Sequence, residues 1–171
     1  MHKFAMLDLG GIVVYGTLLS VLASLILLLA VFFNPRFARN DLPKDIQNKV
    51  PALTRWEKLQ ALFFFVPLIT LMIGIPLAFG VELKSQQGDG VTYLALTGHI
   101  LAVLLTANLF ELLVVDWLIY CTITPKRLVI PNTEGMAGYR DYLHQLRSHA
   151  RGAVVMVFLS LALAGVVLLI T

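Results

Sequence analysis

Charged residues are scarce in this sequence of 171 residues. The 13 Lys and Arg and the 10 Asp and Glu make up 13% of the chain, about half of the ~25% usual in soluble domains. Cys121 is the only cysteine, so no disulfide can form within the chain. The sequence also lacks a glycine-rich phosphate loop, a Ser-His-Asp order and the spacing of zinc ligands. In a chain that is 58% hydrophobic, these shortages exclude a disordered chain, a disulfide scaffold and an ordinary cytosolic enzyme.

The abundant residues are apolar, and they occur in four long runs. The mean hydropathy is +0.84, and about 20 apolar residues suffice to cross the hydrocarbon core of a bilayer. We therefore predict four transmembrane helices, over about 9–33, 59–81, 91–120 and 153–170. The first run is too long for a signal peptide, and no Ala-x-Ala site follows it. The predicted fold is all-α, a polytopic membrane protein in which residues 1–171 form one antiparallel four-helix bundle.

The basic residues are concentrated in two loops, 34–58 and 121–152. These loops hold 11 of the 13 Lys and Arg, whereas the N-terminal tail has only Lys3 and the 82–90 loop only Lys84. The positive-inside rule then places both loops in the cytoplasm and both termini outside it. We predict a multi-pass protein of the cell (inner) membrane. Its expected partners are the lipid bilayer and other membrane subunits or further copies of itself, and not nucleic acid.

Both cytoplasmic loops contain amphipathic segments. Leu42, Ile46 and Val50 form one apolar stripe, which predicts a short interfacial helix with Asp41 as its N-cap. Thr54 to Glu57 is typical of a capping box at the start of the second span. From Gly138 the helical spacing predicts a second interfacial helix that leads into the fourth span. This second helix either forms a docking surface for a cytoplasmic partner or covers the inner end of the bundle. We favour the covering role. Its polar candidates are Arg140, Asp141, Tyr142 and His144.

Small residues recur at four-residue spacing in two of the spans. Such stripes let membrane helices approach closely. The sequence leaves open whether the partner helix belongs to the same chain or to another subunit. The first span offers Gly16, Ser20 and Ser24, and the second offers Thr70, Gly74 and Ala78.

The third span carries nearly all the polar residues expected inside the membrane, namely His99, Asn108, Glu111 and Asp116. Glu111 is the best functional candidate, as a proton site or as a structural acceptor, for example in a salt bridge to Arg36. At 100° per residue, Asp116 lies ~140° around an α-helix from Glu111, so the two are not expected to pair. Asn108 and Glu111 should share a face.

No cofactor and no metal site are predicted. A bis-His haem site would need a second histidine at the depth of His99 in another span, and the spans have none. A haem or chlorin shared with another subunit is left open. His144 and His149 are five residues apart, about 140° around a helix, which is a poor spacing for a metal pair.

Several short segments, most of them on the predicted cytoplasmic side, resemble a family of small bacterial four-helix integral membrane proteins. The family has no assigned activity, so the resemblance implies the architecture and no functional residues. The segments are Asn34-Pro35-Arg36, residues 41–51, Asp116-Trp117-Leu118, Thr124-Pro125-Lys126, Thr133-Glu134-Gly135 and residues 138–142.

Three functions remain after these steps. We rank first a non-enzymatic accessory or structural subunit of a larger membrane complex, because no catalytic constellation is present. The second is a proton- or ion-coupled transport element that uses Glu111, with Asn108 and His99. The third is a membrane enzyme with an inner-face site. Its candidate residues are Asp116, Cys121, Glu134, Arg140, Asp141 and His144.

Overall fold

The chain folds into four long helices. A computed structural model describes residues 8–171, apart from the side chain of Asp89, and the N-terminal tail with Lys3 lies outside this range. The long helices are α1 (Leu9–Phe33), α3 (Arg55–Gln87), α4 (Tyr93–Phe110), which the π-helix η3 (Glu111–Ile123) continues, and α5 (Tyr142–Ile170). All four are long and apolar enough to cross a membrane. The all-α fold and the four spans are thus confirmed, and the architecture is that of a multi-pass membrane protein.

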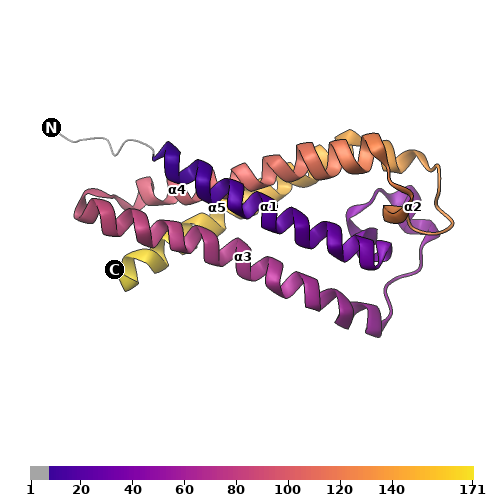
Figure 1. Cartoon of the computed structure of the whole chain (residues 1–171), viewed down its shortest axis with the longest axis horizontal. Coiled ribbons are helices and arrows are strands. Elements are labelled where there is room, and N and C mark those ends of the chain that lie inside the picture. Colours follow the sequence, from indigo (N-terminus) through magenta and orange to yellow (C-terminus); the bar gives the residue numbers. More distant parts are fainter. Residues whose placement is uncertain (1–7) are drawn as a thin grey trace.

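Short helical turns connect the long helices. η1 (Pro35–Asp41) and α2 (Lys44–Lys49) lie between α1 and α3, and η2 (Gly88–Gly90) joins α3 to α4. η4 (Lys126–Leu128) and η5 (Ala137–Arg140) lie between η3 and α5. The start of α1 and the end of α5 lie at one end of the bundle, and α2 lies at the other (Figure 1). We call the half near the helix termini Leu9 and Ile170 the terminal half, and the half near segments 34–54 and 124–141 the loop half.

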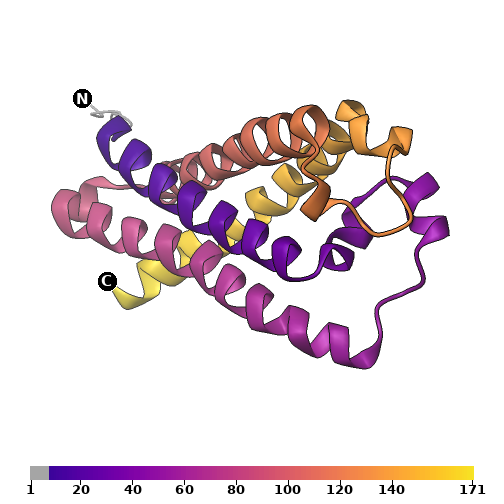
Figure 2. The same ribbon diagram turned by 45° about the vertical axis from the view of Figure 1, so that its right-hand side comes forward.

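α4 lies between α1 and α5 and packs against both, while α3 contacts α1, α4 and α5. Towards the loop half the first turns of α3 diverge from the other helices (Figure 2). Trp56 and Phe63 in these turns are each 77% exposed. Because they face away from the rest of the chain, these apolar side chains fit contact with lipid.

The helix ends show which capping predictions hold. The Thr54–Glu57 capping box at the start of α3 is confirmed, since each side chain bonds the other residue's backbone N–H. The predicted cap Asp41 is wrong. Asp41 ends η1 instead, and Pro43 precedes α2 without a side-chain cap.

The apolar stripe of the first loop is buried against the second loop. Leu42, Ile46 and Val50 form a cluster with Ile130 and Tyr139. α2 therefore packs on protein along this face.

The predicted interfacial helix from Gly138 is part of a longer helix. α5 begins at Tyr142 and runs without a break through Gly152 to Ile170. The fourth span thus starts about three turns earlier than residue 153, and the polar segment forms its first turns. Pro67 and Pro76 likewise lie inside α3 without ending it.

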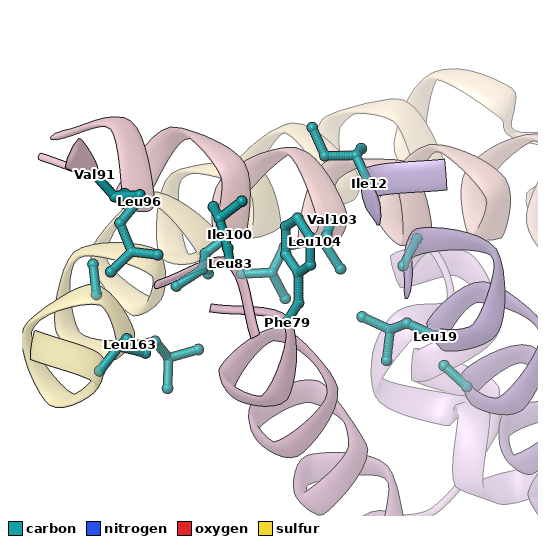
Figure 3. Packing of buried hydrophobic residues seen from close by; sticks show 14 residues of the cluster. Ile12, Leu19, Phe79, Leu83, Val91, Leu96, Ile100, Val103, Leu104 and Leu163 are labelled. Carbon is teal, nitrogen blue, oxygen red and sulfur yellow. The ribbon is translucent and has the colours of Figure 1, made fainter. Parts of the chain in front are cut away.

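Close packing of apolar side chains fills the terminal half (Figure 3). Leu19, Leu96, Ile100 and Leu104 are completely buried there, and Phe79 is nearly so. Such interdigitation stabilises membrane helices through van der Waals contact.

The two small-residue stripes differ in their surroundings. Gly16, Ser20 and Ser24 are buried, and a Cβ on Gly16 would lie 2.9 Å from Cβ of Thr106. This stripe therefore allows the close approach of α1 to α4. Thr70, Gly74 and Ala78 are exposed, and a Cβ on Gly74 would meet no atom within 4 Å. This second stripe therefore lies on the surface of the described chain, with open space at Gly74.

Candidate functional site

A cavity of about 290 Å³ lies in the loop half. α1 and α3 contribute only apolar side chains to its wall, among them Leu27, Leu28 and Phe65. The polar side chains come from η1, α4, η3 and α5. They are Asp41, Asn108, Glu111, Asp116, Tyr120, Gln145, Ser148 and His149. The wall of the cavity is thus apolar where α1 and α3 form it, whereas its polar side chains come from η1, α4, η3 and α5.

The π-helix brings Glu111 and Asp116 to this one cavity. In η3 the backbone bonds run from residue i to residue i+5, as in the 2.8 Å bond from the Thr124 N–H to the Ile119 carbonyl. Residues five apart in a π-helix therefore stand almost above one another, as residues four apart do in an α-helix. The predicted angle of ~140° between Glu111 and Asp116 is wrong because it assumed the 100° per residue of an α-helix. Both residues line the cavity, although no hydrogen bond joins their carboxyl groups in the described chain.

His149 joins α5 to the polar residues of α4 and η3. Its Nε2 lies 2.7 Å from Oδ2 of Asp116, and its Nδ1 lies 2.8 Å from Oδ1 of Asn108. The Asn108 amide nitrogen donates to the His149 carbonyl, 3.4 Å away, which orients the amide oxygen towards the ring. Both ring nitrogens thus face acceptor oxygens, an arrangement that suits the doubly protonated imidazolium. Sequence reasoning treated His149 only as half of a poor metal pair.

Glu111 lines the same cavity, and its carboxyl group forms no hydrogen bond within residues 8–171. The predicted alternative, a salt bridge to Arg36, is wrong. Arg36 instead lies 2.6 Å from Glu57 and donates to the carbonyls of Pro51 and Ala52. An ionisable group without a partner inside a membrane bundle is costly and points to a function.

Asp41 lies at the rim of the cavity. The residue keeps exposed surface while lining the cavity, so the cavity reaches the protein surface beside η1. Burial of its carboxyl group among protein atoms raises the pKa of Asp41, and the charge of Asp116 raises it further, against the opposing effect of His144 and His149.

His99 is a structural residue of the terminal half. Its Nδ1 donates to the Ala95 carbonyl, 2.6 Å away, and its Nε2 accepts the Asp8 backbone N–H at 3.0 Å. The ring is 1% exposed. His99 therefore anchors the start of α1 on α4, with neither ring nitrogen left for another ligand, and it lies apart from the cavity.

Three of the four loop-face candidates form hydrogen bonds within the described chain. Asp141 accepts the His144 backbone N–H at 2.8 Å and so caps α5. The Tyr142 hydroxyl lies 3.0 Å from Oγ1 of Thr122. His144 Nε2 lies 3.0 Å from the Asp41 carbonyl oxygen. Arg140 is exposed at the end of η5.

The residues considered for an enzyme do not converge. Asp116 lines the cavity, but Cys121 is buried elsewhere and Glu134 accepts a hydrogen bond from the Asn132 backbone N–H. Within residues 8–171, no three His, Cys, Asp or Glu side chains are arranged to hold a metal ion. No family model, no curated protein and no solved structure matches the chain. The cavity is therefore the feature of the described chain that bears most directly on function.

Proposed function

We propose that the protein is a proton-coupled transport element in which Glu111 takes up the proton. One observation carries this proposal: the Glu111 carboxyl group lines a cavity that reaches the surface, yet forms no hydrogen bond in the described chain. A carboxylate in such surroundings is stabilised by binding a cation, of which the proton is the smallest. The neighbouring Asp116–His149 pair supplies a second group that can exchange a proton.

The positive-inside rule supports an orientation for this step. Both loops of the loop half are rich in Lys and Arg, so we place them in the cytoplasm of a bacterial cell, with the termini outside. In this orientation the cavity opens to the cytoplasm beside Asp41, and Glu111 exchanges its proton with that side.

The closed terminal half limits what one chain can do alone. Leu19, Ile100 and Leu104 are completely buried there, and none of them lines the cavity, so the cavity does not continue through this half. A complete pathway therefore requires a second chain or a rearrangement of these helices.

Reconstitution into liposomes tests the proposal. With a pH-sensitive dye trapped inside and a potential imposed across the membrane, we expect the protein to accelerate the internal pH change. Glu111→Gln should return the rate to that of protein-free liposomes, because an amide binds no proton near neutral pH. The matched control is Glu82→Gln, the same change in the terminal half, where Glu82 accepts a hydrogen bond from Tyr15.

Two outcomes of the liposome experiment would overturn the proposal. One is a parent protein that leaves the rate at the protein-free level. The other is a Glu111→Gln variant as active as the parent, because proton uptake would then use another group.

A second candidate function is an accessory subunit of a membrane complex. The observation that favours it is the exposed stripe of Thr70, Gly74 and Ala78 on α3, since small residues are enriched where membrane helices pack. On this reading α3 packs against a helix of another chain. Native electrophoresis of solubilised membranes should then show a species larger than the monomer, and substitution of Gly74 by Leu should dissociate it. Migration as a monomer before substitution would count against this role.

A further inference from the structure

The charges around the cavity are unequal. Asp41, Glu111 and Asp116 supply three carboxyl groups, whereas His149 is the one basic side chain of the wall. His149 is already bonded to Asp116. Glu111 is thus left without a positively charged neighbour bonded to it. A cavity of this composition attracts a cation and repels an anion.

The remaining wall is apolar and aromatic. Phe37, Phe65 and Tyr120 line the cavity together with aliphatic side chains of α1. Aromatic faces attract organic cations through their quadrupole, whereas a small inorganic cation needs oxygen ligands on several sides. The combination of carboxylates with three aromatic rings therefore favours an ammonium group that carries a hydrocarbon body.

Two polar side chains beside the carboxylates form no side-chain hydrogen bond in the described chain, and one of them ends in a fully buried hydroxyl. Tyr120 is 7% exposed, and its buried hydroxyl forms no hydrogen bond in the described chain. Gln145 is 8% exposed, and its side-chain amide forms no hydrogen bond within residues 8–171, although it is not among the fully buried polar atoms that lack a partner. Buried polar groups in folded proteins are normally satisfied. Both residues line the cavity, so a ligand with N–H donors placed there would satisfy their oxygens.

We infer that the cavity binds a small protonated amine with an apolar body, whose ammonium group lies between Glu111, Tyr120 and Gln145. The ammonium neutralises the Glu111 carboxylate and donates to the Tyr120 and Gln145 oxygens. Its hydrocarbon part lies against Phe65 and the leucines of α1. The cavity of about 290 Å³ limits the ligand to a small molecule. The inference rests on the proposed function, since it names the substrate class of the same site.

Calorimetric titration of the full-length protein in nanodiscs tests the inference. The probe is phenethylamine, which is protonated at neutral pH, and the matched neutral compound is phenethyl alcohol. We expect saturable binding of the amine and none of the alcohol. Empty nanodiscs measure the partitioning of each compound into lipid.

Two variants locate the ammonium group. Glu111→Gln should weaken amine binding by at least about tenfold, because it removes the charge that pairs with the ligand. Tyr120→Phe should weaken it several-fold and leave the fold intact, since the deleted hydroxyl has no partner. Glu82→Gln, outside the cavity, should bind the amine as the parent does.

The results separate this inference from the proposed function. Absence of saturable amine binding, equal binding by the parent and Glu111→Gln, or equal binding of amine and alcohol would each overturn the inference. Proton flux that depends on Glu111 would still support the proposed function in those cases. Amine binding that depends on Glu111 in a protein without proton flux would support the inference and overturn the proposed function.

Discussion

The two halves of the bundle use the same four helices in different ways. In the terminal half the side chains interdigitate around Leu104 and Phe79, and the buried His99 is fully bonded to backbone groups. In the loop half the helices enclose a cavity, and His149 is bonded to side chains that line it. A histidine bonded to backbone holds helices together, whereas one beside a cavity is placed to act on a ligand. Packing, more than residue type, thus decides which polar side chains are bonded within the bundle and which line its cavity.

Access to water should show the largest contrast between the halves. With Cys121 replaced by Ala to remove the only native thiol, Ser148→Cys places a thiol in the cavity and Ser20→Cys places one in the core. A membrane-impermeant thiol reagent should label the first variant and leave the second unlabelled, because reaction requires a solvated thiolate. Mass spectrometry of the labelled protein measures both. Equal labelling of the two positions would remove the distinction between the halves.

A smaller contrast is expected in helix packing, where Gly16 and Gly74 form a matched pair. Gly16→Ala forces a methyl group to within 2.9 Å of Thr106 Cβ, so we expect a loss of about 1–3 kcal/mol of stability from overpacking. Gly74→Ala meets no atom within 4 Å and should be neutral or slightly stabilising, since Ala favours the helix. Thermal unfolding in mild detergent compares the two. A destabilised Gly74→Ala monomer would contradict the open surroundings of the second stripe.

The sequence predicts the spans well, because long apolar runs have one structural solution in a bilayer. The first span is found at the predicted bounds of 9–33. The second and fourth are longer than predicted, since polar residues continue a helix outside the apolar core without leaving a hydropathy signal. The Gly16 stripe was also predictable, but its partner helix was not, because spacing identifies a surface and says nothing about what covers it.

The candidate site was only partly predictable. Glu111, Asn108 and Asp116 were identified as polar residues within a span, yet their convergence depends on the π-helix η3. No residue type signals i→i+5 bonding, and two acidic residues in an otherwise mostly apolar segment are too few to reveal its periodicity. His149 lies 33 residues from Asp116 in the sequence. One feature of the sequence could have indicated that His149 belongs to the site. His149 lies one turn before the apolar run of the fourth span, at the same end of the bundle as Glu111.

The smallest expected effect concerns the rim of the cavity, where Asp41→Asn tests how far the protein surrounds the carboxyl group. The raised pKa of Asp41 means that the folded chain holds its proton to a higher pH than the unfolded chain does. Stability from this group is therefore present at low pH and is lost as the pH rises through the folded pKa. Asp41→Asn removes that loss, so the variant should exceed the parent in unfolding temperature near neutral pH. The difference should disappear below the ordinary carboxyl pKa of about 3.9.

Glu134→Gln, an exposed change on the other loop, serves as the control. A variant that is less stable than the parent near neutral pH would mean that solvent, and not protein, surrounds the Asp41 carboxylate, and the cavity would then end deeper in the bundle, at Asp116.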